Sequence, residues 1–406
     1  MADSGFKKAI DSIKKATSDE PMVISSDLPE WPALSTGSIV LDKVIGIGGV
    51  PRGKIIEIFG DESAGKTTVG ISLCIQAQKC AGQTEEYPSE GDSGKKIKLT
   101  SVGSALYIDF EHAFHPGYAK NIGLDLSRER FALYQPDYLE KGAAIINHFL
   151  NAGEKAGHRI VDVIVVDSIS AMIPKSEYEG DLEESKRIGL QAALLSQFLA
   201  QASKRFSKQG ITFVAVNQQK PAVILDRYAG GIDTDAKRGY RTSGGRALKF
   251  YAIVRIRLKA TKKEKATIKN SFTGKDDVVP ISTIVKAETV KNKIWYPFRS
   301  GEFVIRFGEG IDNIRSVIDL AIVNGVIEKK GSWFEYNSSV SKDSTFRVQG
   351  VENLRKHILE TKDLIFEIQE QLISKSSSLT KASDVKTSEA KIIVEDFDED
   401  DFEEED

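Results

Sequence analysis

Residues 60–67, Gly-Asp-Glu-Ser-Ala-Gly-Lys-Thr, have the types and spacing of a phosphate-binding loop. The glycines let the backbone approach phosphate oxygens, the lysine supplies a positive charge, and the threonine hydroxyl is a Mg²⁺ ligand. An apolar run precedes the loop at 55–59, and a helical pattern follows it at 68–79. Strand, loop and helix N-terminus in this order form a cradle for phosphates. The predicted nucleotide-binding residues of the cradle are Gly60, Asp61, Glu62, Ser63, Ala64, Gly65, Lys66, Thr67 and Thr68.

A second apolar run, residues 161–167, ends in Asp167. An aspartate at the end of a strand near a phosphate loop is placed to hold the hydration shell of a magnesium ion. The alternative is that Asp167 only caps a helix, as aspartates at such positions often do. Because the phosphate loop lies upstream, we favour the metal role. Thr67 and Asp167 are therefore the predicted metal residues, and ATP and Mg²⁺ are the predicted cofactors.

Glu111 and Gln218 each follow an apolar run, at 105–110 and 211–216 respectively. The carboxyl ends of parallel strands meet at one edge of a sheet, where ligands bind. Glu111 is therefore the candidate base that polarises an attacking water. Gln218 is placed to hydrogen-bond a γ-phosphate and to pass that signal onward, and Tyr118 is placed to stack on adenine. His112 and His115 have no third ligand nearby, which makes a metal site there a weak hypothesis.

Residues 219–243 form a long, basic, glycine-rich stretch that contains two tyrosines and closes at Ser243-Gly-Gly. A loop of this length is expected to be functional or disordered. Basic and aromatic side chains suit contact with phosphates and stacking on bases, although composition alone also fits a solvated surface loop. The segment 180–189 is shorter and mixes acidic residues with a basic pair, so its own signal is poor. The candidate DNA-binding residues are Lys186, Arg187, Lys220, Arg227, Lys237, Arg238, Arg241, Gly244 and Gly245.

Long apolar runs that alternate with helical patterns predict an α/β fold with a mostly parallel central sheet covered by helices on both faces. Charges interrupt the runs at 252–258 and 283–287, which favours antiparallel pairing there. We expect a small oligomerisation arm at 1–33, a core at 34–307 and a small α/β lobe at 308–374 with short helices and an aromatic hairpin. Residues 83–102 are polar and predict an exposed insertion, and residues 375–406 have the composition of a disordered tail.

The 406 residues carry a net charge of −3, but this average hides an uneven distribution. The last twelve residues carry ten carboxylates, which leaves +7 on the rest of the chain. A basic body with an acidic tail is typical of nucleic-acid binders that limit their own binding, and it is equally typical of a solubilising tail. No run approaches 18 apolar residues, no secretory signal precedes the core, and two cysteines form no disulfide framework. We expect a cytoplasmic protein without membrane contact.

Several stretches, in this order, resemble the bacterial RecA-type recombinases over about residues 34–330. They are Leu34-Ser-Thr-Gly-Ser-Ile, the phosphate loop, Ile108-Asp-Phe-Glu-His, Val163-Ile-Val-Val-Asp-Ser, Asn217-Gln, Gly244-Gly-Arg-Ala-Leu-Lys-Phe-Tyr, Val290-Lys-Asn-Lys and Gly308-Glu-Gly. The resemblance implies a RecA-like ATPase core that forms helical filaments on single-stranded DNA, pairs them with homologous duplex DNA and exchanges strands. It implies self-association, both forms of DNA as partners, and single-strand-binding and mediator proteins as further candidates.

The same resemblance implies roles for individual residues. Glu111 becomes the hydrolytic glutamate and Tyr118 the adenine stack, while Gln218 becomes the γ-phosphate sensor. Residues 180–189 and 219–243 match the two DNA-binding loops, and 311–373 the lobe that receives duplex DNA. Lys291 and Lys293 match a pair that reaches the γ-phosphate held by the neighbouring subunit, and Phe250 matches a core residue of the strand after the second loop.

This sequence also departs from the family pattern. Lys186-Arg187 lies near the usual wedge methionine, Arg246 replaces the usual asparagine after Gly-Gly, and His115 stands where an aspartate usually contacts adenine. The second loop is longer and more basic than is usual. These differences indicate a divergent member, of the kind that phages encode, and they make the ATP assignments firmer than individual DNA contacts.

Two other classes of protein compete with a recombinase. A repair or helicase-type ring ATPase shares the core, but the related RadA-type proteins carry a four-cysteine module and a Lys-Asn-Arg-Phe-Gly motif. This chain has no CxxC and has Lys-Asn-Lys-Ile-Trp at 291–295. A filament protein or regulator that binds ATP without useful turnover is the second alternative, and Lys66, Glu111 and Asp167 argue against it.

Overall fold

The computed structural model of the protein describes residues 31–88, 96–180, 189–221, 235, 239–269, 276–338, 345–361 and 363–379. Several predictions fall outside these ranges: the arm before residue 31, the acidic tail, and the side chains of Lys186, Arg187, Arg227, Lys237 and Arg238. The chain divides into two compact units after Ser316, and each unit is described by itself below.

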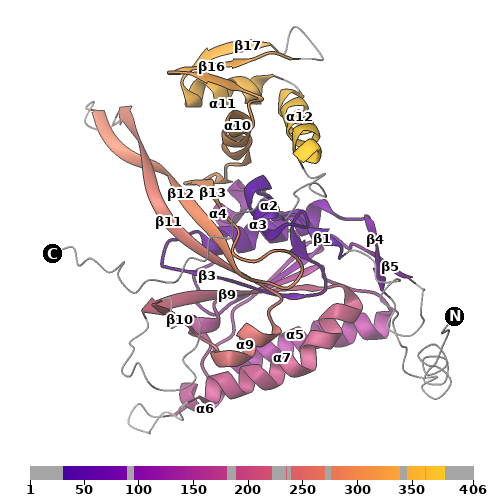
Figure 1. The fold of residues 1–406 in the computed structure, drawn as a ribbon. Helices are drawn as coiled ribbons and strands as arrows, with labels where there is room; N and C mark the ends of the chain where they lie inside the picture. Colours follow the sequence, from indigo (N-terminus) through magenta and orange to yellow (C-terminus); the bar gives the residue numbers. More distant parts are fainter. Residues whose placement is uncertain are drawn as a thin grey trace, which may run out of the picture. The chain divides into compact units, whose positions relative to one another are not determined.

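The first unit is built on a ten-stranded sheet with the order β14-β13-β12-β11-β3-β9-β8-β6-β7, and β10 pairs with β9 off this path. Neighbours from β11 to β7 run parallel, whereas β12, β13 and β14 add antiparallel strands at one side (Figure 1). The bounds are β3 (Ile55–Gly60), β6 (Ala105–Asp109), β7 (Phe131–Tyr134), β8 (Val163–Asp167), β9 (Thr212–Pro221), β10 (Tyr240–Thr242), β11 (Val254–Lys269), β12 (Asp276–Asn292), β13 (Ser300–Arg306) and β14 (Gly310–Ile311).

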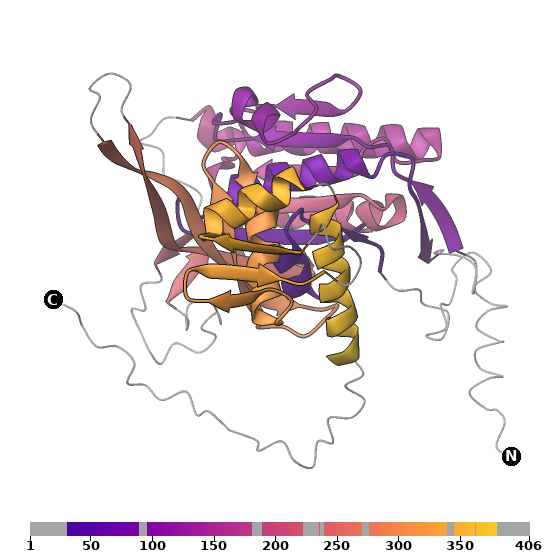
Figure 2. The same cartoon turned by 90° about the horizontal axis from the view of Figure 1, so that it is seen from above.

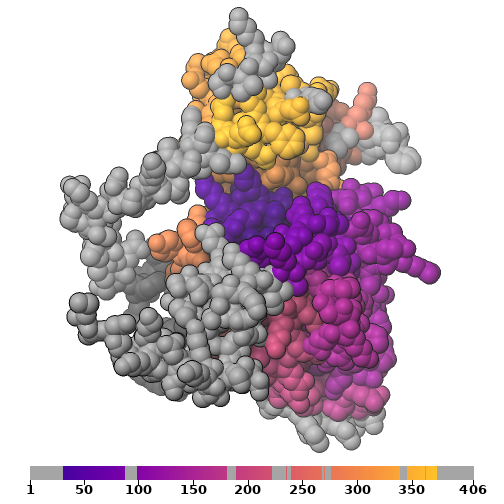
Figure 3. All heavy atoms as spheres, turned by 90° about the vertical axis from the view of Figure 1, so that its right-hand side faces the viewer, coloured from indigo at the N-terminus to yellow at the C-terminus, as the bar shows by residue number. Residues whose placement is uncertain are grey.

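Helices cover both faces of this sheet. α2 (Ile39–Ile45) and α3 (Lys66–Lys79) lie on one face, and α5 (Leu139–Ala156), α7 (Leu190–Gln209) and α9 (Gly245–Tyr251) lie on the other (Figures 1 and 2). The space-filling view shows the same separation, with the indigo N-terminal core above the magenta and pink helices (Figure 3). Both long helices end at glycines with left-handed backbone, Gly157 and Gly210, which satisfy the last carbonyl groups. The shorter helical elements are α4 (Pro116–Asn121), η2 (Ile169–Ala171) and α6 (Lys175–Tyr178).

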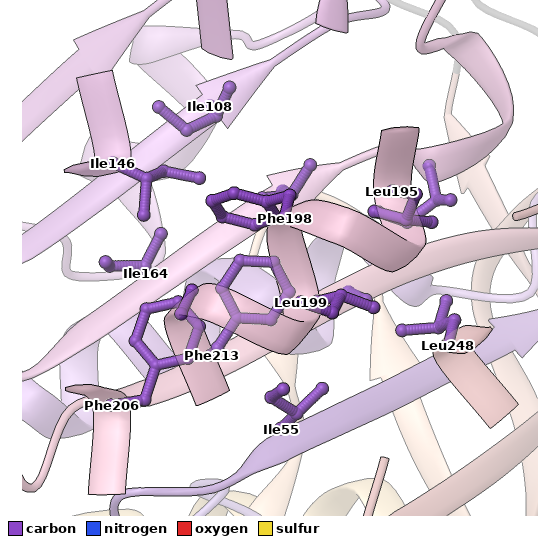
Figure 4. Close-up of a cluster of buried hydrophobic side chains, with 14 of the residues drawn as sticks. Ile55, Ile108, Ile146, Ile164, Leu195, Phe198, Leu199, Phe206, Phe213 and Leu248 are labelled. Carbon is purple, nitrogen blue, oxygen red and sulfur yellow. The ribbon is translucent and has the colours of Figure 1, made fainter. Parts of the chain in front are cut away.

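The main hydrophobic core lies between the sheet and the layer of α5, α7 and α9 (Figure 4). The Phe213 ring on β9 has its centroid 5.0 Å from that of Phe206 and 6.2 Å from that of Phe198, both on α7. Ile164 on β8 and Leu150 on α5 are fully buried in the same cluster. Truncating an aromatic side chain in such a core typically costs about 3–5 kcal/mol, so this layer stabilises the positions of the inner strands β8 and β9.

Two small two-stranded antiparallel sheets flank the main sheet: β1 (Ala33–Leu34) with β2 (Val50–Pro51), and the hairpin of β4 (Thr84–Pro88) with β5 (Lys96–Thr100). The β4-β5 hairpin is the predicted insertion, and most of its described residues are exposed. Its Glu85 is different, because the carboxylate lies 2.5 Å from Arg52 Nε and 3.3 Å from Arg159 Nη2. Both arginine side chains are almost fully buried. This ion cluster anchors the insertion to the core.

The second unit begins within α10 (Asn313–Val323) and has a three-stranded antiparallel sheet with two further helices. Phe334 and Tyr336 on the central strand are buried, and Tyr336 donates a 2.8 Å hydrogen bond to Glu367. The predicted α/β fold with a mostly parallel sheet and a small α/β lobe is confirmed. The last helix runs beyond the predicted lobe end at residue 374. The bounds are β15 (Glu328–Lys330), β16 (Trp333–Tyr336), β17 (Phe346–Gln349), α11 (Val351–Glu360) and α12 (Leu364–Leu379).

The ion cluster predicts a specific loss of stability. Glu85→Gln keeps the size of the side chain but leaves Arg52 and Arg159 short of negative charge. We expect a loss of about 3 kcal/mol in unfolding free energy, the lower end for a broken buried ion pair, because Glu85 is partly exposed. Urea denaturation followed by circular dichroism measures it, with Glu86→Gln on the same strand as the control. Equal stability of both variants would show that the cluster does not anchor the hairpin.

Candidate nucleotide site

The phosphate loop connects β3 to α3 as the sequence predicts. β3 ends at Gly60, and α3 begins at Lys66 after Gly65, whose φ is 83°. A Cβ at Gly60 would lie 2.0 Å from the Leu258 carbonyl oxygen, and one at Gly65 would lie 2.2 Å from Ile305 Cδ1. Gly60 is therefore required by close packing against the backbone of Leu258. Gly65 is required by its backbone angle, because Ile305 Cδ1 is the end of a flexible side chain that can shift. The first residues of α3, Lys66, Thr67 and Thr68, line the pocket described below, and the first N–H groups of a helix have no partner within the helix and can bind anions.

Lys66 supplies the cation of the site. Its Nζ donates to the carbonyl oxygens of Asp61 at 2.6 Å and Gly60 at 3.2 Å. Burial lowers the pKa of Lys66, and the nearby carboxylates Asp167 and Glu111 oppose that shift. A partly desolvated ammonium that is held only by backbone carbonyls is placed to exchange them for phosphate oxygens.

Asp167 and Thr67, for which a shared metal role is predicted, are in contact beside the loop. Thr67 Oγ1 donates to Asp167 Oδ2 at 2.7 Å, and Tyr107 donates its hydroxyl to the same oxygen at 2.6 Å. Burial raises the pKa of Asp167, and the hydrogen bonds from Tyr107 and Thr67 oppose that rise. Tyr107 is a positioning residue that sequence patterns did not reveal, because it looks like any other apolar member of a buried strand.

Glu111 and Gln218 come together at the same edge. Gln218 Nε2 donates to Glu111 Oε1 at 3.0 Å, and the Ser168 hydroxyl donates to that same oxygen. Asp109 fixes the turn after β6 by accepting the backbone N–H groups of Glu111 at 3.1 Å and Phe114 at 2.9 Å. The candidate base and the candidate sensor are thus in direct contact, although 107 positions separate them. Ser168 and Asp109 were not predicted, since only the folded strand ends bring them here.

Lys66, Thr67, Glu111, Asp167 and Gln218 line one pocket of about 650 Å³. The Tyr118 hydroxyl lies 3.0 Å from Thr68 Oγ1, and Tyr118 forms part of the pocket wall. His115 caps α4 by accepting the Tyr118 N–H at Nδ1. Gly60 and Asp61 stand just outside the lining and contact Lys66 through their carbonyl groups. The lining residues are Glu62, Ser63, Ala64, Gly65, Lys66, Thr67, Thr68, Glu111, Tyr118, Asp167, Gln218, Gln219, Thr283, Ile305, Phe307 and Gly308.

The second predicted DNA loop begins and ends as a β-ribbon, which the sequence did not predict. β9 continues through Pro221, and β10 returns with Arg241 opposite Lys220. Both of these basic side chains are exposed. Gly244 and Gly245 begin α9, and a Cβ at either would come within 2.8 Å of a side chain on α7, Leu195 or Ala192. The φ angles of Gly244 and Gly245 are +86° and +66°, so the left-handed backbone favours glycine at both positions, and the side chains on α7 leave little room for a Cβ.

Lys291 and Lys293 do not line the pocket. Lys291 donates to the carbonyl oxygens of Lys249 and, at 3.1 Å, Phe250 at the end of α9, and burial lowers the pKa of Lys291 to about 8. Lys293 is exposed. The prediction that Phe250 is a core residue of a strand is wrong, because Phe250 lies on α9 and is 72% exposed. The family resemblance suggested a core position in a strand, but Leu248 is the buried residue of this helix.

A phosphate loop, a strand-end aspartate, a glutamate and a glutamine at one edge of a parallel sheet define a P-loop ATPase. The RecA N-terminal domain model matches residues 5–90 and 96–312, and the RecA C-terminal domain model matches 315–377. Protein RecA of Clostridium novyi is 36% identical, with 88% of this chain and 89% of that protein aligned. Protein RecA of Campylobacter fetus is 37% identical, with 84% of this chain and 83% of that protein aligned. Protein RecA of Corynebacterium diphtheriae is 34% identical, with 92% of this chain and 87% of that protein aligned.

The chain therefore belongs to the RecA family, the DNA-dependent P-loop ATPases that act as recombinases. The predicted resemblance is confirmed over most of the chain, including the C-terminal lobe. Within the described ranges, no helix combines the length and apolar character that a bilayer span requires.

The pair of hydrogen bonds on Asp167 generates a prediction with a defined sign. Tyr107→Phe removes one of the two bonds that oppose the raised pKa of Asp167, so that pKa rises further. A larger fraction of Asp167 is then protonated at mildly acidic pH. Mg²⁺-dependent nucleotide binding is therefore lost at a higher pH than in the unaltered protein. We expect Mg²⁺ affinity to fall by about tenfold, as for the loss of an outer-shell partner. Magnesium titrations of a fluorescent ATP analogue at pH 6 and pH 8 measure both effects.

Tyr134→Phe is the matched control, because Tyr134 lies on the neighbouring strand β7. Unchanged magnesium titrations of Tyr107→Phe at both pH values would remove Tyr107 from the site.

Proposed function

We propose that this chain polymerises as a helical filament on single-stranded DNA and exchanges that strand with a homologous duplex while hydrolysing ATP. The observation that carries the proposal is the meeting of Lys66, Asp167, Glu111 and Gln218 at one pocket. The proposed partners are single-stranded and double-stranded DNA and further copies of this chain, together with single-strand-binding and mediator proteins. The proposed location is the cytoplasm.

ATP and Mg²⁺ are the proposed cofactors, and the residues present fit them. The pocket is large enough for a nucleotide, and it combines one ammonium group, backbone N–H donors and a Thr–Asp oxygen pair. Magnesium is usually held by one or two protein oxygens together with phosphate oxygens and waters. When bound, Mg²⁺ would neutralise phosphate charge. Lys66 and the N–H groups of the loop would hold the phosphates, and Tyr118 would flank the base.

In the proposed reaction, Glu111 accepts a proton from the attacking water. Its Oε1 is held by Gln218 and Ser168, so its position is fixed before the nucleotide arrives. Gln218 would give up its hydrogen bond to Glu111 and donate to a γ-phosphate oxygen instead. This would move the end of β9, where the second DNA loop starts. This shared partner gives a physical route by which nucleotide state reaches DNA contacts. We propose that Lys220 and Arg241 contact DNA phosphates, together with Lys186, Arg187, Arg227, Lys237 and Arg238.

The role of Glu111 is tested by Glu111→Gln. The amide keeps the hydrogen bonds of the site but cannot take up a proton. ATP binding and DNA binding should persist, while DNA-stimulated hydrolysis falls by about 10²–10⁴-fold, the usual contribution of a general base. Steady-state phosphate release gives the rate, and Glu129→Gln, an exposed surface change, is the control. Near-normal hydrolysis by Glu111→Gln would exclude Glu111 as the base.

The role of Lys291 is tested by complementation between subunits. If Lys291 completes the neighbour's site, Lys291→Ala should retain weak nucleotide binding and lose cooperative, DNA-stimulated hydrolysis. Mixing it with Asp167→Asn should restore part of the activity, because one kind of interface then contains two intact halves. Co-assembly on DNA is first verified by light scattering. Absence of rescue at every mixing ratio, with co-assembly shown, would contradict a shared site.

A further inference from the structure

Four polar residues form a buried chain of contacts across the sheet, away from the nucleotide pocket. They are Glu57 on β3, Asn217 on β9, Arg255 on β11 and Asp235 from the predicted second DNA loop. All four are at most 4% exposed. Buried charges are costly unless they are paired, and removing one partner leaves the other uncompensated. The four residues are therefore expected to respond as a unit.

Asp235 ties the second loop to this chain. Its carboxylate accepts from Arg255 Nη2 at 2.8 Å and Nη1 at 3.2 Å, and it lies 2.7 Å from Lys249 Nζ on α9. Burial by itself would raise the pKa of Asp235, but the hydrogen bonds from Arg255 and Lys249 outweigh burial, so the pKa is lowered. Asp235 is thus an ionised carboxylate gripped by two cations.

The other end of the chain reaches the γ-phosphate sensor. Arg255 Nε donates to Glu57, and Glu57 Oε1 accepts from Asn217 Nδ2 at 2.9 Å. Asn217 Nδ2 also donates to the carbonyl oxygen of Ser243, where the second loop closes, and its Oδ1 accepts the Gln218 N–H. Gln218 in turn contacts Glu111. Asn217 therefore joins the loop, the buried charges and the catalytic edge.

We propose that Asp235 is a positioning residue that couples DNA binding by the 219–243 loop to the placement of Gln218 at the nucleotide site. This inference rests on the proposed function. When DNA binding takes Asp235 away from its partners, the buried Arg255 guanidinium is left with Glu57 as the remaining carboxylate of the chain, and the partly buried Lys249 loses its contact with Asp235. Arg255 then pairs with Glu57 alone, and the geometry of the hydrogen bond between Glu57 and Asn217 changes as a result. Gln218, the next residue, changes its position relative to Glu111.

The test measures ATP turnover with and without saturating single-stranded DNA in the full chain. Asp235→Asn keeps the shape of the side chain and removes its charge. We expect the ratio of DNA-stimulated to DNA-free turnover to fall by about fivefold or more, the range of ordinary coupling between sites. The DNA concentration that gives half-maximal stimulation is measured separately and should change less than the ratio. Asp235→Glu, which retains the charge, should recover part of the ratio.

Glu264→Gln is the matched control, because Glu264 lies on the same strand as Arg255 and pairs with Arg315 outside the chain of contacts. Lys249→Met, which removes the second cation from Asp235, replaces Asp235→Asn should that variant fail to fold. A normal ratio in the Asp235 and Lys249 variants, or an equal loss in Glu264→Gln, overturns the inference. Absence of DNA stimulation in the unaltered protein would instead contradict the proposed function, so the two failures are distinguishable.

Discussion

The parallel register of β3, β9, β8 and β6 is the constraint on which the rest of the site depends. It places Gly60, the first residue of the phosphate loop, opposite Gln218, and it places Asp109 opposite Asp167. Each strand end then contributes one group to a single edge, in agreement with the general location of ligands in α/β sheets. A shift of one residue in any pairing would turn these side chains to the other face of the sheet. The aromatic layer around Phe213 protects this register.

Burial and hydrogen bonding oppose each other throughout the site, and the balance prepares it for a charged ligand. Desolvation lowers the pKa of Lys66 and raises the pKa of Asp167, so each charged form is less stable than in water. Backbone carbonyls hold Lys66, while Tyr107 and Thr67 hold Asp167. In the proposed complex, phosphate oxygens would pair with Lys66 and a metal ion would pair with Asp167, so each group would gain a partner of opposite charge. The arrangement therefore favours the nucleotide complex over the free protein.

Sequence patterns predicted local features well and contacts between distant residues poorly. The phosphate loop, the strand ends and the positions of Glu111 and Gln218 follow from short motifs and apolar runs. The contact between Arg255 and Glu57 joins residues 198 positions apart, so no local pattern contains it. Phe250 was misplaced because the family resemblance put it in a strand, whereas it lies on the helix α9, which exposes it. The ribbon at the base of the second loop escaped prediction because its glycines and charges are typical of loops.

The most direct measurement is strand exchange between circular single-stranded DNA and a homologous linear duplex, with the unaltered protein, Mg²⁺ and ATP. A recombinase of this family should produce joint molecules and then nicked circles, and it should do so only when the two DNAs share sequence and ATP is present. Turnover of ATP on single-stranded DNA that never yields joint molecules would contradict the account. The site would then belong to a DNA-stimulated ATPase that does not pair homologous strands.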